Sequence, residues 1–233
     1  MHTRMKPQLA AIVISAVISA CAGTPSADAP SNTPPVAASS TPATTPAGPR
    51  ITLKDAFTLG HRTAPLALVV YADYQCPYCA RFHHGMLGDI KARYVDSGVL
   101  LYVHKDFPLR MHPQALPAAI AARCAGAQGR YGTMQGRLYE AQTNLGEPLY
   151  TQLATTIGLD LAAFQTCRAD PATHRSVERD LREGQRANVT ATPTLLLGRI
   201  EGDSVIIERV SAGLPSLDAL GAEIERLRAS PSR

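Results

Sequence analysis

The feature that most constrains this chain is a pair of cysteines, Cys76 and Cys79, placed just after a short apolar run. The run, Leu66–Tyr71, is rich in β-branched residues and is expected to be a buried strand. Residues Ala80–Asp96 carry apolar side chains at helical spacing, and Gly98 follows their end. A strand therefore leads the chain to a helix start at the dithiol, which favours a fold built around a β-α-β unit.

The remaining pattern predicts more strands and a long helical segment. Further strands are expected at Val99–Val103, Thr194–Leu197 and Val205–Val210, and an amphipathic helix at Ser216–Arg228. Between the second and third strands, at about residues 114–187, the pattern is helical. We expect an α/β fold over residues 50–233, with a mixed central sheet and an inserted all-helical subdomain.

The N-terminus has the pattern of an export signal. Arg4 and Lys6 precede an apolar stretch, Leu9–Ala20, that is too short to span a bilayer. It ends Ser19-Ala20-Cys21, and small residues before a cysteine resemble a bacterial lipoprotein processing site. We expect residues 1–20 to be a lipoprotein signal peptide and Cys21 to be lipidated, which would anchor the protein in the bacterial cell envelope, facing the periplasm. An ordinary secretory signal is the alternative.

A linker is expected at residues 21–49, where Pro, Ala, Thr and Ser dominate. Such a segment has almost nothing to bury, so it should be an extended, disordered tether. The net charge is +4, and two of the basic residues lie in the expected signal peptide. No run of basic residues forms a phosphate-binding stripe in the sequence, which argues against nucleic acid as the main partner.

The chain has five cysteines. Without Cys21, the remaining four allow three pairings. Cys76 and Cys79 can close a local ring, which leaves Cys124 and Cys167 for each other. A structural disulfide between that second pair is the expectation in an oxidising compartment. Two free buried thiols, or a second redox relay, are the alternatives.

A Cys-X-X-Cys pair serves either redox chemistry or metal binding. Pro77 suits a first helical turn, and the free N–H groups of a helix start would stabilise a thiolate at Cys76. Cys79, one turn further, would be more buried and would resolve a mixed disulfide. A Cys2His metal site with His83 or His84 is the alternative, but the second cysteine pair that zinc sites usually use is missing. We therefore expect redox use, with no metal and no organic cofactor.

Four motifs occur in one order: Tyr71-Ala72-Asp73-Tyr74-Gln75-Cys76-Pro77-Tyr78-Cys79, Asp106-Phe107-Pro108-Leu109, Cys124, and Thr192-Pro193-Thr194. In this order and spacing they resemble the DsbA-type thioredoxin family of envelope disulfide oxidoreductases, over about residues 50–229. The resemblance implies a thioredoxin fold with an inserted helical subdomain. It also implies a catalytic dithiol with a cis-proline loop packed against it.

Position by position, the resemblance makes Cys76 the nucleophile and Cys79 the resolving thiol. It makes Thr192-Pro193 the cis-proline loop, which presents backbone groups to a bound peptide. The dipeptide is Pro77-Tyr78, where well-known members often have Pro-His. Because tyrosine is uncharged near neutral pH, we expect a weaker oxidant than the strongest members.

The expected function is a thiol:disulfide oxidoreductase that oxidises envelope proteins by exchange and is reset by a membrane redox partner. A reductase or isomerase using the same dithiol is the first alternative. A copper or zinc binding protein and a catalytically idle interaction module are the others. Asp73, three residues before Cys76, is expected to be a loop carboxylate near the helix start, with tuning of the thiol as its alternative role.

Overall fold

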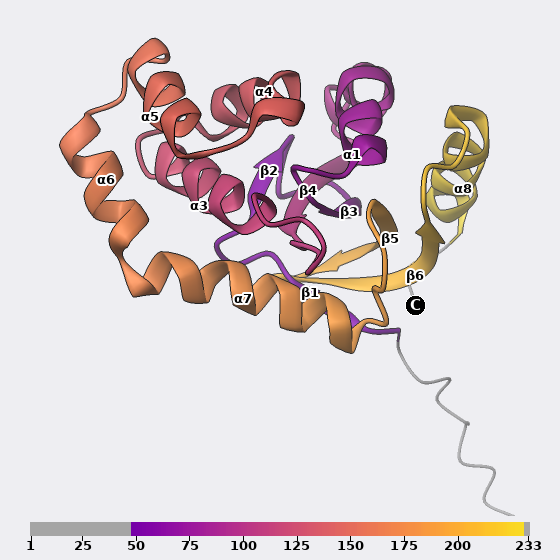
Figure 1. Cartoon of the computed structure of the whole chain (residues 1–233). Helices are drawn as coiled ribbons and strands as arrows, with labels where there is room; N and C mark the ends of the chain where they lie inside the picture. The colour runs from indigo at the N-terminus through magenta and orange to yellow at the C-terminus, as the bar shows by residue number, and fades with distance from the viewer. Residues whose placement is uncertain (1–47, 231–233) are drawn as a thin grey trace, which may run out of the picture. The chain divides into compact units, whose positions relative to one another are not determined.

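The structure, a computed structural model, describes residues 48–230 (Figure 1). The expected signal peptide, Cys21 and most of the linker lie outside this range. Six strands form one sheet in the order β1-β6-β5-β3-β4-β2. Their bounds are Arg50–Thr52 (β1), Phe57–Leu59 (β2), Leu66–Ala72 (β3), Leu100–Asp106 (β4), Thr194–Glu201 (β5) and Ser204–Ala212 (β6).

The sheet is mixed, as expected from the sequence. Strands β3 and β4 run parallel, whereas the other neighbouring pairs are antiparallel. Every residue of β3 is buried, because both faces of this apolar run are covered. The edge strands β1 and β2 were not predicted, since three residues each are too few to show an alternating pattern.

The helix after β3 starts at the dithiol, as expected, with Pro77 in its first turn as α1 (Pro77–Arg81). The apolar helical spacing, which starts at Ala80, marks only the part of the helix after this first turn. The helix then continues through a π-helical turn, η1 (Phe82–Met86), into α2 (Leu87–Ile90) and a second π-helical turn, η2 (Lys91–Val95). Phe82, Leu87 and Ile90 bury against one face of the sheet, where α8 (Leu217–Ala229) also packs.

Helices fill the connection between β4 and β5, so the prediction of a thioredoxin-like sheet with a helical insertion is confirmed. They are α3 (Ala115–Gly126), α4 (Tyr131–Glu140), the 3-10 turn η3 (Gln142–Asn144), α5 (Glu147–Thr156), α6 (Leu161–Ala169) and α7 (Pro171–Arg186). Within residues 48–230, no helix is both long enough and apolar enough to cross a membrane.

The C-terminal half of α7 covers the second face of the sheet (Figure 1). A Cβ atom at Gly184 would lie 2.8 Å from Tyr71 and 2.9 Å from Phe107, so only glycine lets the helix come this close. Leu181 of α7 and Ala187, the residue that follows the helix, pack into the core layer on this face. Cys76 and Cys79 belong to the core layer on the other face.

Candidate active site

Cys76 lies in the short connection between β3 and α1. A tight turn, in which the Cys76 N–H donates to the Asp73 carbonyl at 3.1 Å, places Cys76 as the N-cap of the helix. Pro77 occupies the first helical turn, where its missing N–H leaves no hydrogen bond unmade. Cys76 is only 4% exposed, whereas the neighbouring Tyr78 is 55% exposed. Cys76 is therefore shielded from solvent, although it lies next to an exposed aromatic side chain.

The segment just before β5 lies against the Cys76 sulfur, although it is distant in sequence. The Thr192–Pro193 peptide bond is cis. The Cys76 thiol donates to the Thr192 carbonyl oxygen, with 3.2 Å between Sγ and O. The structure thus brings the Thr192-Pro193 segment against the dithiol, across 116 sequence positions.

The surroundings of Cys76 favour its thiolate. Its pKa is lowered to about 5, chiefly because the Cys79 thiol donates a hydrogen bond to the Cys76 sulfur. The Thr192 side chain and the backbone N–H groups of Cys79 and Tyr78 lower the pKa further, while burial opposes them. The helix start contributes as the sequence suggested, but the second cysteine contributes more.

Cys79 has the opposite character. It is almost completely buried, and this burial, together with its hydrogen bond to Cys76, raises the pKa of its thiol. The Asp73 N–H points at its sulfur over 3.5 Å. Because a hydrogen bond joins the two sulfur atoms, the thiols titrate as a coupled pair, and Cys76 loses its proton first.

Asp73 is the loop carboxylate that the sequence suggested. One of its oxygens accepts from the Gln75 N–H at 2.7 Å. The other accepts from the Leu109 N–H and from His112 Nδ1, each at 2.8 Å. Asp73 therefore ties the loop after β4 to the dithiol turn, and both of its oxygens are already engaged.

Sequence reasoning missed Gln142, which lies in the turn η3 of the helical insertion. Its side-chain amide donates to the carbonyl oxygens of Tyr74, at 2.7 Å, and Cys76, at 2.9 Å. The insertion thus holds the backbone of the dithiol turn directly. A lone glutamine between two helices carries no pattern that could have identified it.

Cys124 and Cys167 form a disulfide in the structure. Cys124 is fully buried in α3 and Cys167 is partly buried in α6, so the bond joins two helices of the insertion. Neither residue contributes to the hydrogen bonds around Cys76 described above.

The two histidines after the dithiol do not join it in a metal-binding arrangement. His83 is half-buried, and its ring lies 4.8 Å from that of Tyr139. Burial lowers the pKa of His83 to about 4, so this side chain is neutral at physiological pH. Across residues 48–230, no three His, Cys, Asp or Glu side chains gather in a way that could hold a metal ion.

The fold and the site together define a class: a thioredoxin-type sheet with a helical insertion and a dithiol at the start of its first long helix. A family model described as thioredoxin matches residues 52–213. The chain belongs to this thioredoxin family, and its fold is that of the DsbA-type thiol–disulfide oxidoreductases. This confirms the family resemblance found in the sequence.

Solved structures support the assignment. The α-DsbA1 protein of Wolbachia pipientis superposes with a TM-score of 0.66 at 26% identity, covering 75% of this chain and 91% of that one. BdbD of Bacillus subtilis has a TM-score of 0.66 at 21% identity, covering 77% of this chain and 96% of that one. At that identity, BdbD supports the fold alone.

Curated relatives are longer proteins that match this chain over part of their length. The Na(+)/H(+) antiporter NhaA 1 of Mycolicibacterium vanbaalenii is 34% identical over 145 residues, which is 60% of this chain and 23% of the antiporter. NhaA 3 of Salinispora tropica is 32% identical over 159 residues, which is 67% of this chain and 24% of the antiporter. The chain thus spans about a quarter of the length of these relatives.

Proposed function

We propose that this protein introduces disulfides into envelope proteins by exchange through Cys76 and Cys79. The observation that carries the proposal is the opposite shift of the two thiol pKa values, lowered for Cys76 and raised for Cys79. A stabilised thiolate is a good leaving group, and it stabilises the reduced form of the enzyme. Both effects make the Cys76–Cys79 disulfide an oxidant.

In the proposed reaction, a substrate thiolate attacks Cys76 Sγ of the oxidised enzyme. The Cys76–Cys79 bond breaks, and Cys79 leaves as a thiolate that takes up a proton, because its pKa is raised. A second substrate thiolate then attacks the substrate sulfur of the mixed disulfide and releases Cys76 as a thiolate. Two electrons have moved from the substrate dithiol to the enzyme, without any organic cofactor.

The redox potential would fix the direction of exchange. The Cys76 pKa of about 5 lies between the values of about 7 for thioredoxin and about 3.5 for DsbA. We therefore expect a potential between roughly −270 and −120 mV, the values of those two proteins. Equilibration with glutathione buffers, followed by thiol alkylation and mass analysis, measures it. A potential at or below that of thioredoxin would favour the reductase alternative.

We infer that the partners are reduced or misoxidised proteins, bound along Thr192-Pro193, and a membrane redox partner that re-oxidises the dithiol. The contact between Cys76 Sγ and the Thr192 carbonyl supports the first part, because an extended peptide beside Cys76 would meet that backbone. In a Cys79→Ala variant, mixed disulfides with Cys76 should accumulate, since the resolving thiol is gone. Their absence from cells expressing the variant would argue against exchange with proteins.

We also propose that Cys21 is lipidated and tethers the domain through residues 22–49 in the cell envelope. The short apolar stretch that ends at Cys21 supports this. Diacylation would give stable anchoring, which a single chain does not. Mass spectrometry of the membrane-extracted protein is the test, with Cys21→Ser as the control. A mature N-terminus elsewhere would favour the ordinary secretory signal.

A further inference from the structure

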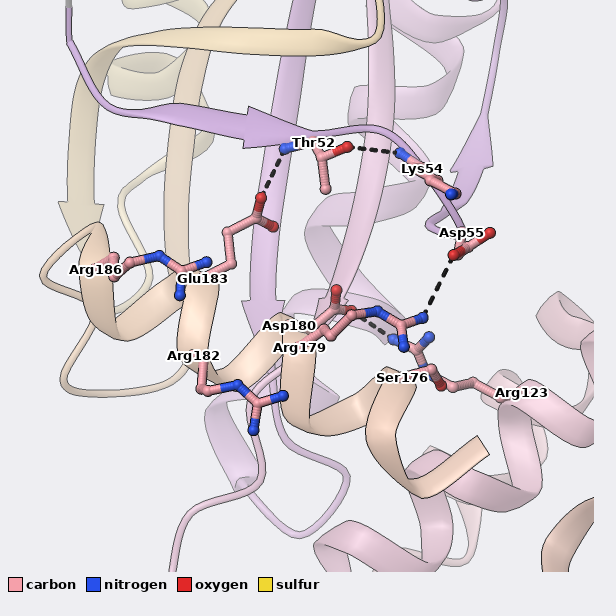
Figure 2. A pocket seen from close by; sticks show the side chains of 10 residues that line it. All are labelled: Thr52, Lys54, Asp55, Arg123, Ser176, Arg179, Asp180, Arg182, Glu183 and Arg186. Atoms are coloured by element: carbon pink, nitrogen blue, oxygen red, sulfur yellow. Dashed lines mark hydrogen bonds and ion pairs between the residues drawn. The ribbon is translucent and has the colours of Figure 1, made fainter. Parts of the chain in front are cut away.

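A hollow lies between α7 and the segment that joins β1 to β2 (Figure 2). Its volume is about 640 Å³, within the range of small-molecule sites. Five basic side chains contribute to its lining: Lys54, Arg123, Arg179, Arg182 and Arg186. No residue of the dithiol site lines it, because this part of α7 covers the opposite face of the sheet.

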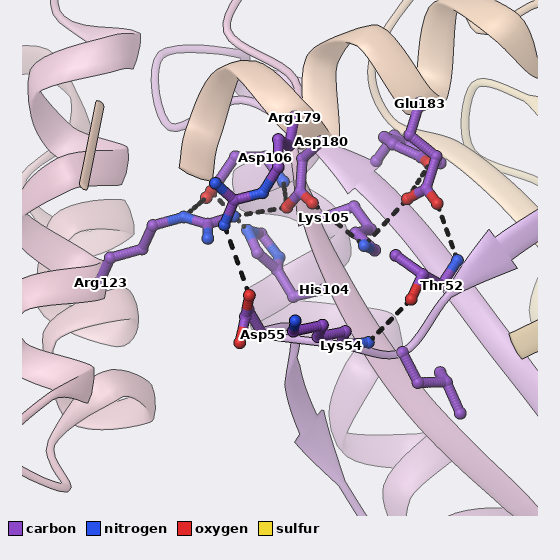
Figure 3. A network of polar contacts seen from close by, with 12 residues as sticks. Thr52, Lys54, Asp55, His104, Lys105, Asp106, Arg123, Arg179, Asp180 and Glu183 are labelled. Atoms are coloured by element: carbon purple, nitrogen blue, oxygen red, sulfur yellow. Dashed lines mark hydrogen bonds and ion pairs between the residues drawn. The ribbon is translucent and has the colours of Figure 1, made fainter. Parts of the chain in front are cut away.

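Three carboxylates also line the hollow, but two of them are engaged from inside the protein. The Nζ atom of Lys105, whose side chain is fully buried, lies 3.0 Å from Asp180 and 2.9 Å from Glu183 (Figure 3). Arg123 also pairs with Asp180, and the Thr52 N–H donates to Glu183 at 2.7 Å. These two carboxylates therefore stabilise the core and do not neutralise the outer arginines.

The outer part of the hollow is consequently positive. Arg179 pairs with Asp55 over 3.4 Å, and Arg182 pairs with Glu178 over 3.2 Å, with more than half of each side chain exposed. Exposed pairs of this kind are weak and screened by solvent, so their guanidinium groups can exchange partners. Arg186 lies in the last turn of α7, on the same side of the helix as Arg182 (Figure 2).

We propose that this hollow is a second ligand site, which takes a phosphate-type dianion. Guanidinium groups offer planar, bidentate donors that match phosphate oxygens, and several of them around one concave surface concentrate the positive potential. The phosphate can belong to a free phosphate or to a lipid headgroup, and both present the same oxygens. The site is separate from the dithiol, so ligand binding does not require exchange activity.

The test compares two double charge reversals in the full chain. Arg182→Glu with Arg186→Glu changes the hollow, and Arg226→Glu with Arg228→Glu makes the same charge change on α8. The control is closely matched, since Arg182 and Arg226 each pair with a glutamate about one turn earlier on an exposed helix surface. Thermal melting by circular dichroism verifies that both variants fold.

Inorganic phosphate is titrated calorimetrically at low ionic strength. In parallel, the proteins are co-sedimented with phosphatidylcholine vesicles that contain or lack phosphatidic acid. We expect saturable binding by the unmodified chain and the α8 variant, weakened about tenfold or more in the α7 variant. Binding of phosphate identifies a free-phosphate site, and binding of phosphatidic acid vesicles alone identifies a headgroup site.

Two results would overturn the proposal. One is that neither phosphate nor phosphatidic acid binds to the unmodified chain. The other is that both variants lose binding equally, because binding would then reflect the overall charge of the protein and not this hollow.

Discussion

The side-chain amide of Gln142 donates a hydrogen bond to the carbonyl oxygen of Cys76 at 2.9 Å. That carbonyl also accepts from the N–H groups of Cys79 and Ala80 at 3.0 and 3.2 Å, as the first turn of the dithiol helix. The backbone of the nucleophile is thus fixed from two sides, by its own helix and by the insertion. The helical insertion therefore contributes to the rigidity of the site as well as to its surroundings.

Replacing Gln142 with leucine should loosen this turn. The Cys76 carbonyl would keep its two backbone donors, but the Tyr74 carbonyl would lose the donor that Gln142 supplies, and an acceptor left unsatisfied away from water costs about 1–3 kcal/mol. Urea denaturation of the reduced protein measures the loss in free energy of unfolding. Gln152→Leu, at an exposed position of α5, is the control and should change little. Equal effects in the two variants would show that the bonds of Gln142 contribute nothing specific.

The Cys76 thiolate should depend on the hydrogen-bonding ability of residue 79. In Cys79→Ser a hydroxyl can still donate to Cys76, so the pKa should stay well below that of a free thiol. In Cys79→Ala the largest cause of the shift is removed, and the pKa should rise. Ultraviolet thiolate absorbance against pH measures both. Identical pKa values in the two variants would show that the helix start, not Cys79, dominates.

The same shift predicts how the stability of the reduced form depends on pH. Since the folded pKa of Cys76 is depressed to about 5, the stabilisation is fully present above the unfolded pKa of about 8.5. It is lost as pH falls through the folded pKa. Above the unfolded pKa, Cys79 acts in the opposite sense, because its raised pKa keeps it protonated. As pH rises from about 5 to 8.5, the free energy of unfolding of the reduced form should therefore increase relative to that of the oxidised form, as denaturation curves at several pH values would show.

Thr192→Val should separate redox tuning from stability. The Thr192 hydroxyl is buried and has no hydrogen-bond partner within residues 48–230, so its proton is free to stabilise a Cys76 thiolate. Valine removes that donor, which should raise the Cys76 pKa and lower the redox potential. The free energy of unfolding of the oxidised protein should stay the same or rise, because an unpaired polar group has been removed. Thr192→Ser, which keeps the hydroxyl, should leave the pKa nearly unchanged.

The dithiol could be found from the sequence because two cysteines, a helix start and a strand lie within one short segment. The central strands and the helical insertion were predictable from their apolar runs, and the start of the first helix was predictable from Pro77 beside Cys76. Gln142 could not be predicted, since its role depends on how the insertion folds back. The positive hollow could not be predicted from the sequence, because the arginines of α7 are interspersed with acidic residues. Only the fold shows that Asp180 and Glu183 point inward to Lys105.

The disulfide in the insertion should contribute to stability and not to exchange. Cys124 and Cys167 are separated by 43 positions, for which the chain-entropy model gives roughly 4 kcal/mol. Replacing both with alanine should lower the melting temperature while Cys76 still exchanges with a model disulfide at a similar rate. A marked loss of exchange at temperatures where the variant is folded would instead support a second redox relay.

Lys105 should be among the most sensitive positions outside the dithiol site. Its side chain is fully buried, and its ammonium group faces the carboxylates of Asp180 and Glu183 (Figure 3). Lys105→Met would leave the buried Asp180 and the partly buried Glu183 without this cation, and breaking a buried pair typically costs about 3–5 kcal/mol. Burial already raises the pKa of Asp180, and Lys105 acts to lower it.

The loss of Lys105 should therefore raise the pKa of Asp180 further, so the destabilisation should shrink as pH falls and the carboxylate takes up a proton. Urea denaturation at two pH values measures this. The control is Lys91→Met, which breaks a half-exposed pair with Asp96 and should cost no more than about 1 kcal/mol. If the two methionine variants lose equal stability at neutral pH, the buried cluster is not the stabilising element described here.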